Sequence, residues 1–206
     1  MAVLLCLQCV HAQQTSSQNT AGQEVRTDLR ELIPDVVVHD QDGRSLRFYS
    51  DLLKDKVFII NFVYASCRGT CPVLGKNLAT LQRRLSDRDR KELHLISISI
   101  DPANDSPQIL KSLSKSFHAK SHWTFVTGER TSMEKLLRAL IGDLPRKGEH
   151  SDAILIGDEA GGVLERRWGL AAPETLTQTI NDILTASRVR RAVKPPSSNP
   201  PRRPDE

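Results

Sequence analysis

Two cysteines, Cys67 and Cys71, lie four residues apart directly after the apolar run VFIINFVY at 57–64. The residues between them are Arg, Gly and Thr, and Pro72 follows the second cysteine. Thiols at this spacing either cycle between dithiol and disulfide or bind a soft metal ion together. The sequence therefore indicates one site, which either carries out thiol–disulfide redox chemistry or binds a metal ion.

Pro72 predicts that a helix begins at the cysteines, because proline lacks an N–H and belongs in a first helical turn. Cys71 is then expected near the N-cap and Cys67 in the preceding loop, which Gly69 allows to fold back. A helix N-terminus favours negative charge, so we expect a lowered pKa for at least one thiol. Three intervening residues leave space for an ion between the sulfurs. Two thiolates suit Cu(I), and an added imidazole also accommodates Cu(II).

The first twelve residues, 1–12, predict a signal peptide, because a short apolar run is followed by small residues at the positions before a cut after Ala12. The run is about half of the ~20 residues that span a bilayer, so we expect no transmembrane anchor from it. We expect export, to the periplasm or the outer face of the inner membrane.

Cleavage at that point would change the cysteine count. Cys6 and Cys9 would leave with the signal, so any intramolecular disulfide would join Cys67 and Cys71. Such a small ring constrains the unfolded chain little, because stabilisation grows with the logarithm of loop length. A purely structural disulfide is therefore a weak explanation of the pair.

The rest of the chain predicts strands that alternate with helices. Apolar and β-branched runs predict strands at 34–39, 45–48, 57–63, 93–100, 123–128, 153–156 and 163–166. Helical periodicity or capping signals follow at 72–85, 107–117, 133–140 and 173–184. This alternation indicates an α/β layered domain, and a strand leading to a cysteine-bearing turn and helix is typical of thioredoxin-like folds. We expect a central mixed sheet flanked by helices, with an N-terminal hairpin.

Polar composition sets the expected limits of this domain. Residues 13–31 are rich in Gln, Ser and Thr and predict a flexible linker, and 188–206, rich in Pro, Arg and Ser, predict a disordered tail. The domain is then expected over 32–187. The net charge is +4, with much of the excess in the tail, and no basic stripe interleaved with aromatic residues marks the body. We therefore expect no nucleic-acid partner.

Three segments in order resemble the Sco (SenC) family of thioredoxin-like copper proteins, which assist cytochrome c oxidase assembly. They are YASCRGTCP at 64–72, SISIDPANDSP at 97–107 and HSDAILIGD at 150–158. The resemblance covers roughly residues 32–186. It implies a metal site made by Cys67, Cys71 and His150. Asp101 and Asp105 match acidic positions of the second segment, to which we assign mainly turn and capping roles.

The resemblance implies a copper carrier without turnover, which delivers Cu(I) or Cu(II) to the dinuclear copper site of cytochrome c oxidase. The partner is then the copper-bearing oxidase subunit or another copper or thiol protein. Two enzymatic hypotheses remain open on the same fold. A thiol–disulfide oxidoreductase would use Cys67 and Cys71 as its catalytic pair without His150. A peroxidase-like protein would oxidise one of them to a sulfenic acid.

The other histidines of the body, His39, His94, His118 and His122, have no cysteine nearby in the sequence. We expect each of them to face solvent or to make structural hydrogen bonds.

Overall fold

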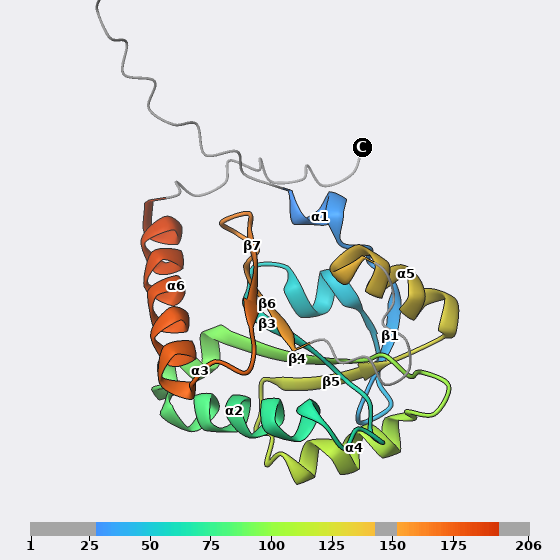
Figure 1. The fold of residues 1–206 in the computed structure, drawn as a ribbon. Coiled ribbons are helices and arrows are strands. Elements are labelled where there is room, and N and C mark those ends of the chain that lie inside the picture. The colour runs from blue at the N-terminus through green and yellow to red at the C-terminus, as the bar shows by residue number, and fades with distance from the viewer. Residues whose placement is uncertain (1–27, 143–151, 194–206) are drawn as a thin grey trace, which may run out of the picture.

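The computed structural model describes residues 28–142 and 152–193 (Figure 1). The described strands form one seven-stranded sheet in the order β2-β1-β5-β4-β3-β6-β7. Strand β4 pairs in parallel with β3 and β5, and the other pairings are antiparallel. The strands are β1 (Val37–Asp40), β2 (Ser45–Arg47), β3 (Val57–Val63), β4 (Leu93–Ser99), β5 (Trp123–Thr127), β6 (Ala153–Asp158) and β7 (Val163–Trp168). The mixed sheet and the β1–β2 hairpin confirm the expected α/β thioredoxin-like class.

Helices cover both faces of this sheet (Figure 1). They are α1 (Leu29–Leu32), the π-helix η1 (Phe48–Leu53), α2 (Thr70–Arg84), α3 (Asp87–Glu92), α4 (Pro107–Ser116), α5 (Arg130–Ile141) and α6 (Pro173–Val193). One hydrophobic cluster joins the sheet to α1, η1 and α5. A second cluster joins the opposite face to α2, α4 and α6. No helix within 28–142 or 152–193 combines the length and apolar character needed to cross a membrane.

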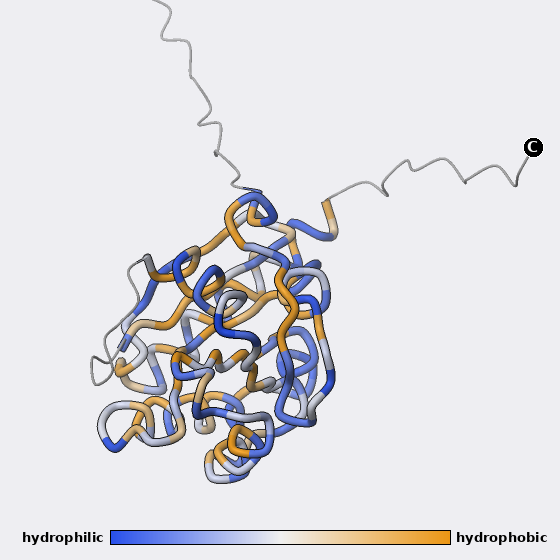
Figure 2. Tube along the Cα trace, turned by 90° about the vertical axis from the view of Figure 1, so that its right-hand side faces the viewer, coloured by the Kyte–Doolittle hydropathy of each residue, from blue (hydrophilic) through white to orange (hydrophobic). Residues whose placement is uncertain are grey.

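Strand β3 lies in the middle of the core and is buried along its whole length. Its alternate side chains point to opposite faces, so Phe58 and Ile60 join the first cluster while Val57 and Ile59 join the second. Figure 2 shows hydrophobic segments running through the interior of the fold. This double burial explains the almost continuous apolar run and fixes the point at which the chain leaves the sheet toward the cysteines.

The N-terminal limit expected for the domain was wrong. Helix α1 begins at Leu29, so its first three residues fall in the segment 13–31 that composition assigned to a linker. Asp28 caps it by accepting a hydrogen bond from the Arg30 N–H, and Leu29 is buried. The helix forms because Leu29 packs in the cluster with α5, a tertiary contact that outweighs the polar composition around it.

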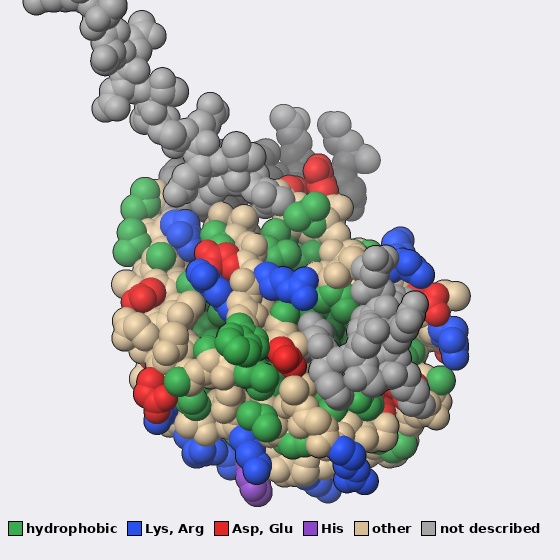
Figure 3. Space-filling model, in the orientation of Figure 1, with side chains coloured by type: hydrophobic (Ala, Val, Ile, Leu, Met, Phe, Trp, Pro, Cys, Tyr) green, Lys and Arg blue, Asp and Glu red, His purple; other side chains and the backbone are tan. Residues whose placement is uncertain are grey.

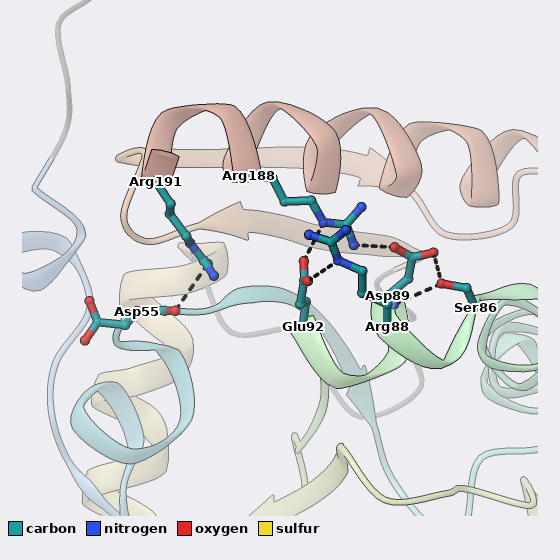
Figure 4. A network of polar contacts seen from close by, with 7 residues as sticks. All are labelled: Asp55, Ser86, Arg88, Asp89, Glu92, Arg188 and Arg191. Carbon is teal, nitrogen blue, oxygen red and sulfur yellow. Dashed lines mark hydrogen bonds and ion pairs between the residues drawn. The ribbon is translucent and has the colours of Figure 1, made fainter. Parts of the chain in front are cut away.

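The C-terminal limit was also wrong, because α6 continues past residue 187 to Val193. Arg188 donates from Nε to Glu92 of α3 at 2.7 Å and also pairs with Asp89 (Figure 4). Arg190 donates from Nη2 to the Asp158 carboxylate of β6 at 2.6 Å. These pairs hold the last turns of α6 on the domain, so basic residues expected in a solvated tail are part of the folded body.

Arg190 is expected to stabilise the fold, because it is the counter-ion of Asp158, whose side chain is 0% exposed. Arg190→Ala leaves that carboxylate buried without its cation and should lower the free energy of unfolding by about 2 kcal/mol or more. Urea denaturation measures the change. Arg191→Ala is the matched control, since Arg191 contacts the exposed Asp55 carbonyl, and it should change stability by less than about 0.5 kcal/mol. Equal effects of the two substitutions would contradict the assignment.

Candidate metal and thiol site

The two cysteines lie between the end of β3 and the first turn of α2. After Val63, a loop turns back with a hydrogen bond from the Cys67 N–H to the Tyr64 carbonyl at 3.1 Å. Gly69 is the N-cap of α2, and Cys71 is the second helical residue. The structure therefore confirms the expected placement, with one thiol in the loop and the other in the first turn of the helix.

A buried carboxylate holds this loop. Asp105, 2% exposed, accepts a hydrogen bond from the Ala65 N–H at 3.1 Å and one from the Ser99 hydroxyl at 2.6 Å. The Asp105 N–H in turn donates to the Asp101 carbonyl, as expected for a turn, while Ser106 caps α4. Asp105 therefore does more than the turn role expected from the sequence, because it ties the thiol loop to the end of β4.

The sequence carried a partial signal for this contact. Strands β3 and β4 were both expected, and parallel neighbours bring their carboxyl ends to the same edge of a sheet. Asp105 follows β4 as the thiol loop follows β3. The sequence did not indicate that the Ala65 N–H is the partner of Asp105, because any residue except proline can supply a backbone N–H.

Cys67 and Cys71 are both reduced thiols in the structure and each residue is 7% exposed, but their ionisation differs. Burial disfavours the Cys67 thiolate, yet hydrogen bonds from the Cys71 thiol and backbone N–H outweigh it and lower the pKa of Cys67. The Gly69 N–H and the Tyr64 hydroxyl donate to the same sulfur. Burial, together with the hydrogen bond and negative charge of Cys67, raises the pKa of Cys71 to about 12.

Tyr64 completes the surroundings of the Cys67 sulfur. Burial and its hydrogen bond to Cys67 raise the pKa of Tyr64 to about 12, so its hydroxyl stays protonated and remains a donor at neutral pH. The pair can therefore hold one negative charge on Cys67 and one proton on Cys71. Such a pair offers a nucleophile with a resolving thiol, or a first metal ligand with a second ligand that loses its proton on binding.

The third expected ligand, His150, lies outside the described residues. Within the described ranges, no group of three or more His, Cys, Asp or Glu side chains is placed to hold a metal ion. The described chain resumes at Asp152, directly before β6. Strand β6 runs antiparallel to β3, with Ile60 opposite Leu155. The start of β6 therefore lies beside the carboxyl end of β3, where the thiol loop begins.

The remaining histidines lie elsewhere. His39 is within hydrogen-bond distance of the Ser45 hydroxyl, at 3.2 Å. His94 and His122 face each other with ring centroids 5.4 Å apart, at the start of β4 and before β5. Burial and the nearby Lys56 charge lower the pKa of His94 to about 4. His94 pairs with Phe58 at the beginning of β3, so this pair lies at the opposite end of the sheet from the thiols.

In the reduced, metal-free protein, Cys67 should react with iodoacetamide at neutral pH at least about tenfold faster than Cys71. The two residues are equally exposed, so the difference comes from their pKa values, since the thiolate is the nucleophile. Peptide mass spectrometry after timed quenching gives both rates. Cys71→Ala should slow Cys67, because its sulfur loses a donor. Faster labelling of Cys71 in the wild type would contradict the assignment.

Asp105→Ala should lower the free energy of unfolding by about 2 kcal/mol, because it leaves the buried Ser99 hydroxyl and the Ala65 N–H without their acceptor. Asp105→Asn keeps an acceptor oxygen and should cost less. Asp101→Ala is the matched control, with a half-buried side chain that accepts from Asn104. Urea denaturation compares the three variants, and an Asp105→Ala protein as stable as wild type would rule out this anchor.

Comparison with known proteins identifies the family and several relatives of this chain. The model of the SCO1/SenC family matches residues 30–185. The SCO1 protein homolog of Bacillus subtilis is 26% identical over 136 residues, which are 65% of this chain and 69% of that protein. An SCO2-like protein of Rickettsia felis is 32% identical over 107 residues, 52% of this chain, so the match spans about half (51%) of that relative.

Solved structures share the fold. BsSco, described as a member of the Sco family of cytochrome c oxidase assembly proteins with a disulfide switch, matches with a TM-score of 0.63 and 23% identity over 82% of this chain and 96% of its own. Yeast Sco1 with copper bound matches with a TM-score of 0.62 and 22% identity over 73% of this chain and 90% of its own. The family match extends from α1 into α6 and includes the whole thiol site. The chain therefore belongs to the SCO1/SenC family.

Proposed function

We propose that this protein is a copper carrier that holds copper on Cys67, Cys71 and His150 and delivers it to the dinuclear copper site of cytochrome c oxidase. The observation that supports this most is the pair of adjoining thiols with opposite pKa shifts at the start of α2. Two such sulfurs match the ligand preference of Cu(I), and an imidazole would extend it to Cu(II).

The residues around the pair have defined roles in this proposal. The Cys67 thiolate, held by donors from the start of α2, is the first ligand. Cys71 gives up its proton when it becomes the second ligand, so binding releases a proton. Tyr64 and Asp105 position the loop without being ligands. A site of three protein ligands leaves room for an incoming cysteine of the acceptor, which ligand exchange requires.

Family membership supports the cargo and the target. Copper is present in the yeast relative, and BsSco is described as belonging to a family of oxidase assembly proteins. We carry both over to this chain as part of the proposal. We also propose that it acts in the periplasm or at the outer face of the inner membrane, where the leader-like residues 1–12 would direct it.

A second function is favoured by the same difference between the thiols. As a thiol–disulfide oxidoreductase, the Cys67 thiolate attacks a disulfide of the target, forming a mixed disulfide and releasing one target thiolate. Deprotonated Cys71 then attacks the Cys67 sulfur, which closes the Cys67–Cys71 disulfide and releases the second target thiolate. Two electrons pass from this protein to its target. The disulfide switch described for BsSco agrees with such a step.

Copper titration of the reduced protein with His150→Ala beside it tests the carrier function. We expect one copper per chain in the wild type and an affinity weakened by at least about tenfold in the variant. His118→Asn is the matched control, because His118 is exposed, lies away from the thiols after α4, and has a positive φ of 55° that asparagine tolerates. The control should bind as the wild type does.

The same set of variants separates the rival functions. Disulfide formation between the two cysteines should be intact in His150→Ala, while Cys67→Ser and Cys71→Ser abolish it. Equal copper binding with and without His150 would contradict the three-ligand carrier and favour the reductase. Peroxide consumption with a catalytic rate would instead favour the peroxidase-like alternative.

A further inference from the structure

Three hydrogen bonds fix the backbone of Tyr64 beside the thiols. The carbonyl of the preceding residue accepts from the Ile100 N–H at 2.9 Å. The N–H of the following residue donates to the buried Asp105 carboxylate at 3.1 Å. The Tyr64 carbonyl itself accepts from the Cys67 N–H at 3.1 Å. The end of β3, the segment after β4 and the thiol loop therefore hold Tyr64 in place from both sides.

The side chain of Tyr64 contacts the Cys67 sulfur from this fixed position. It is half-buried, and its hydroxyl donates a hydrogen bond to that sulfur. The other donors to the sulfur are the Cys71 thiol and the backbone N–H groups of Gly69 and Cys71. Almost any residue supplies a backbone N–H, and Cys71 is a member of the thiol pair. The Tyr64 hydroxyl is therefore a donor that a substitution can remove while both thiols and the helix start are kept.

The groups that touch the sulfur, and not the charged surface, stabilise its negative charge. Burial disfavours the Cys67 thiolate, and the main influences that lower its pKa are hydrogen bonds rather than a neighbouring cation. On the face that Figure 3 draws, Lys and Arg side chains are interspersed with Asp and Glu side chains. Exposed charges farther away than about 8 Å are largely screened at physiological ionic strength. The state of the Cys67 sulfur therefore depends on its own hydrogen bonds.

The Tyr64 hydroxyl has a strong acceptor in only one redox state of the pair. In the dithiol, Cys67 carries the negative charge, and a hydrogen bond to a charged acceptor is stronger than one to a neutral acceptor. In a Cys67–Cys71 disulfide, the Cys67 sulfur is neutral, and neutral sulfur is a weak acceptor. The hydrogen bond from Tyr64 therefore stabilises the reduced form more than the oxidised form.

We propose that Tyr64 is a positioning residue whose hydroxyl shifts the dithiol–disulfide equilibrium of Cys67 and Cys71 toward the reduced form. Reduction breaks the S–S bond with two electrons from a dithiol donor, which itself closes to a disulfide. Of the two protons that the donor loses, one goes to Cys71 and one to solvent, and the charge stays on Cys67. This inference rests on the use of the pair in the function proposed above. It adds the residue that keeps the pair ready to bind copper or to reduce a target.

The test measures the redox equilibrium of the metal-free protein. Wild type and Tyr64→Phe are equilibrated in buffers of reduced and oxidised dithiothreitol, the thiols are trapped with iodoacetamide, and peptide mass spectrometry gives the oxidised fraction of Cys67 and Cys71. Tyr64→Phe should shift the equilibrium constant toward the disulfide by about tenfold, because the reduced form loses a charge-assisted hydrogen bond. For a two-electron couple, this shift makes the reduction potential about 30 mV more negative.

Tyr49→Phe is the matched control, because it removes the same hydroxyl group elsewhere in the fold. The Tyr49 hydroxyl donates to the Glu159 carboxylate, which also accepts from the Asp55 N–H just before β3. This contact lies near the amino end of β3, whereas the thiol loop follows its carboxyl end. Tyr49→Phe should leave the dithiol–disulfide equilibrium unchanged even where it lowers stability.

Absorption of the Cu(II)-loaded protein gives a second readout that a purely structural role would not move. A hydrogen bond lowers the energy of the sulfur lone pairs, and hydrogen bonding around a cysteine sulfur tunes the electronic properties of bound copper. The Cu(II)–thiolate charge-transfer band should therefore move to longer wavelength in Tyr64→Phe. It should stay at the wild-type position in Tyr49→Phe.

The outcomes separate this inference from the proposed function. Equal equilibrium constants for wild type and Tyr64→Phe would overturn the inference, while the carrier function would still be decided by copper titration with His150→Ala. Equal shifts in Tyr64→Phe and Tyr49→Phe would also overturn it, because the change would then come from the fold and not from the sulfur contact. If the wild-type pair closes no disulfide in any of the buffers, Tyr64 has no equilibrium to shift and the inference fails.

Discussion

The sulfur of Cys67 lies against the first N–H groups of α2, and the chemistry of the site depends on that contact. Hydrogen bonds from Gly69 and Cys71 stabilise negative charge on Cys67. Burial, together with that charge, raises the pKa of Cys71 and so favours its protonated form. The two pKa values differ because burial weighs on Cys71, while the donors at the start of the helix point at Cys67. A small shift of the loop would therefore alter both thiols together.

The fold fixes this contact from two directions. Burial of β3 on both faces sets where the chain leaves the sheet, and the Asp105 carboxylate holds the Ala65 N–H just beyond that point. Gly75 allows α2 to pack closely on α4, since a Cβ there would meet the Phe117 ring at 2.5 Å. The helix start, the strand end and the thiol loop are thus held by separate contacts.

Copper binding and disulfide exchange would both use the same pair of thiols. A thiolate next to a protonated thiol is ready to attack a disulfide and equally ready to bind a soft ion. What separates the two functions is the third ligand, because a reductase has no use for His150 while a three-ligand carrier depends on it. The fold itself does not distinguish them.

Much of the fold and of the thiol site could be predicted from the sequence. The buried strand, the cysteine turn and Pro72 predicted the start of α2 to within two residues, because backbone sterics and hydrophobic burial act locally. The limits of the domain were missed where distant partners decide them. Leu29 packs on a core built from later segments, and Arg188 and Arg190 find their carboxylates in α3 and β6. The role of Asp105 was missed for the same reason, because its partner is a backbone N–H forty positions earlier. His150 lies outside the described residues and stays a prediction.

The most direct test of the account is X-ray absorption at the copper edge of the copper-loaded protein. It counts the atoms bound to copper and identifies them as sulfur or nitrogen. The account predicts two sulfur neighbours and one imidazole nitrogen in the wild type, with the imidazole signal lost in His150→Ala and both sulfurs kept. Copper bound by nitrogen and oxygen alone, or an imidazole that persists in His150→Ala, would contradict it.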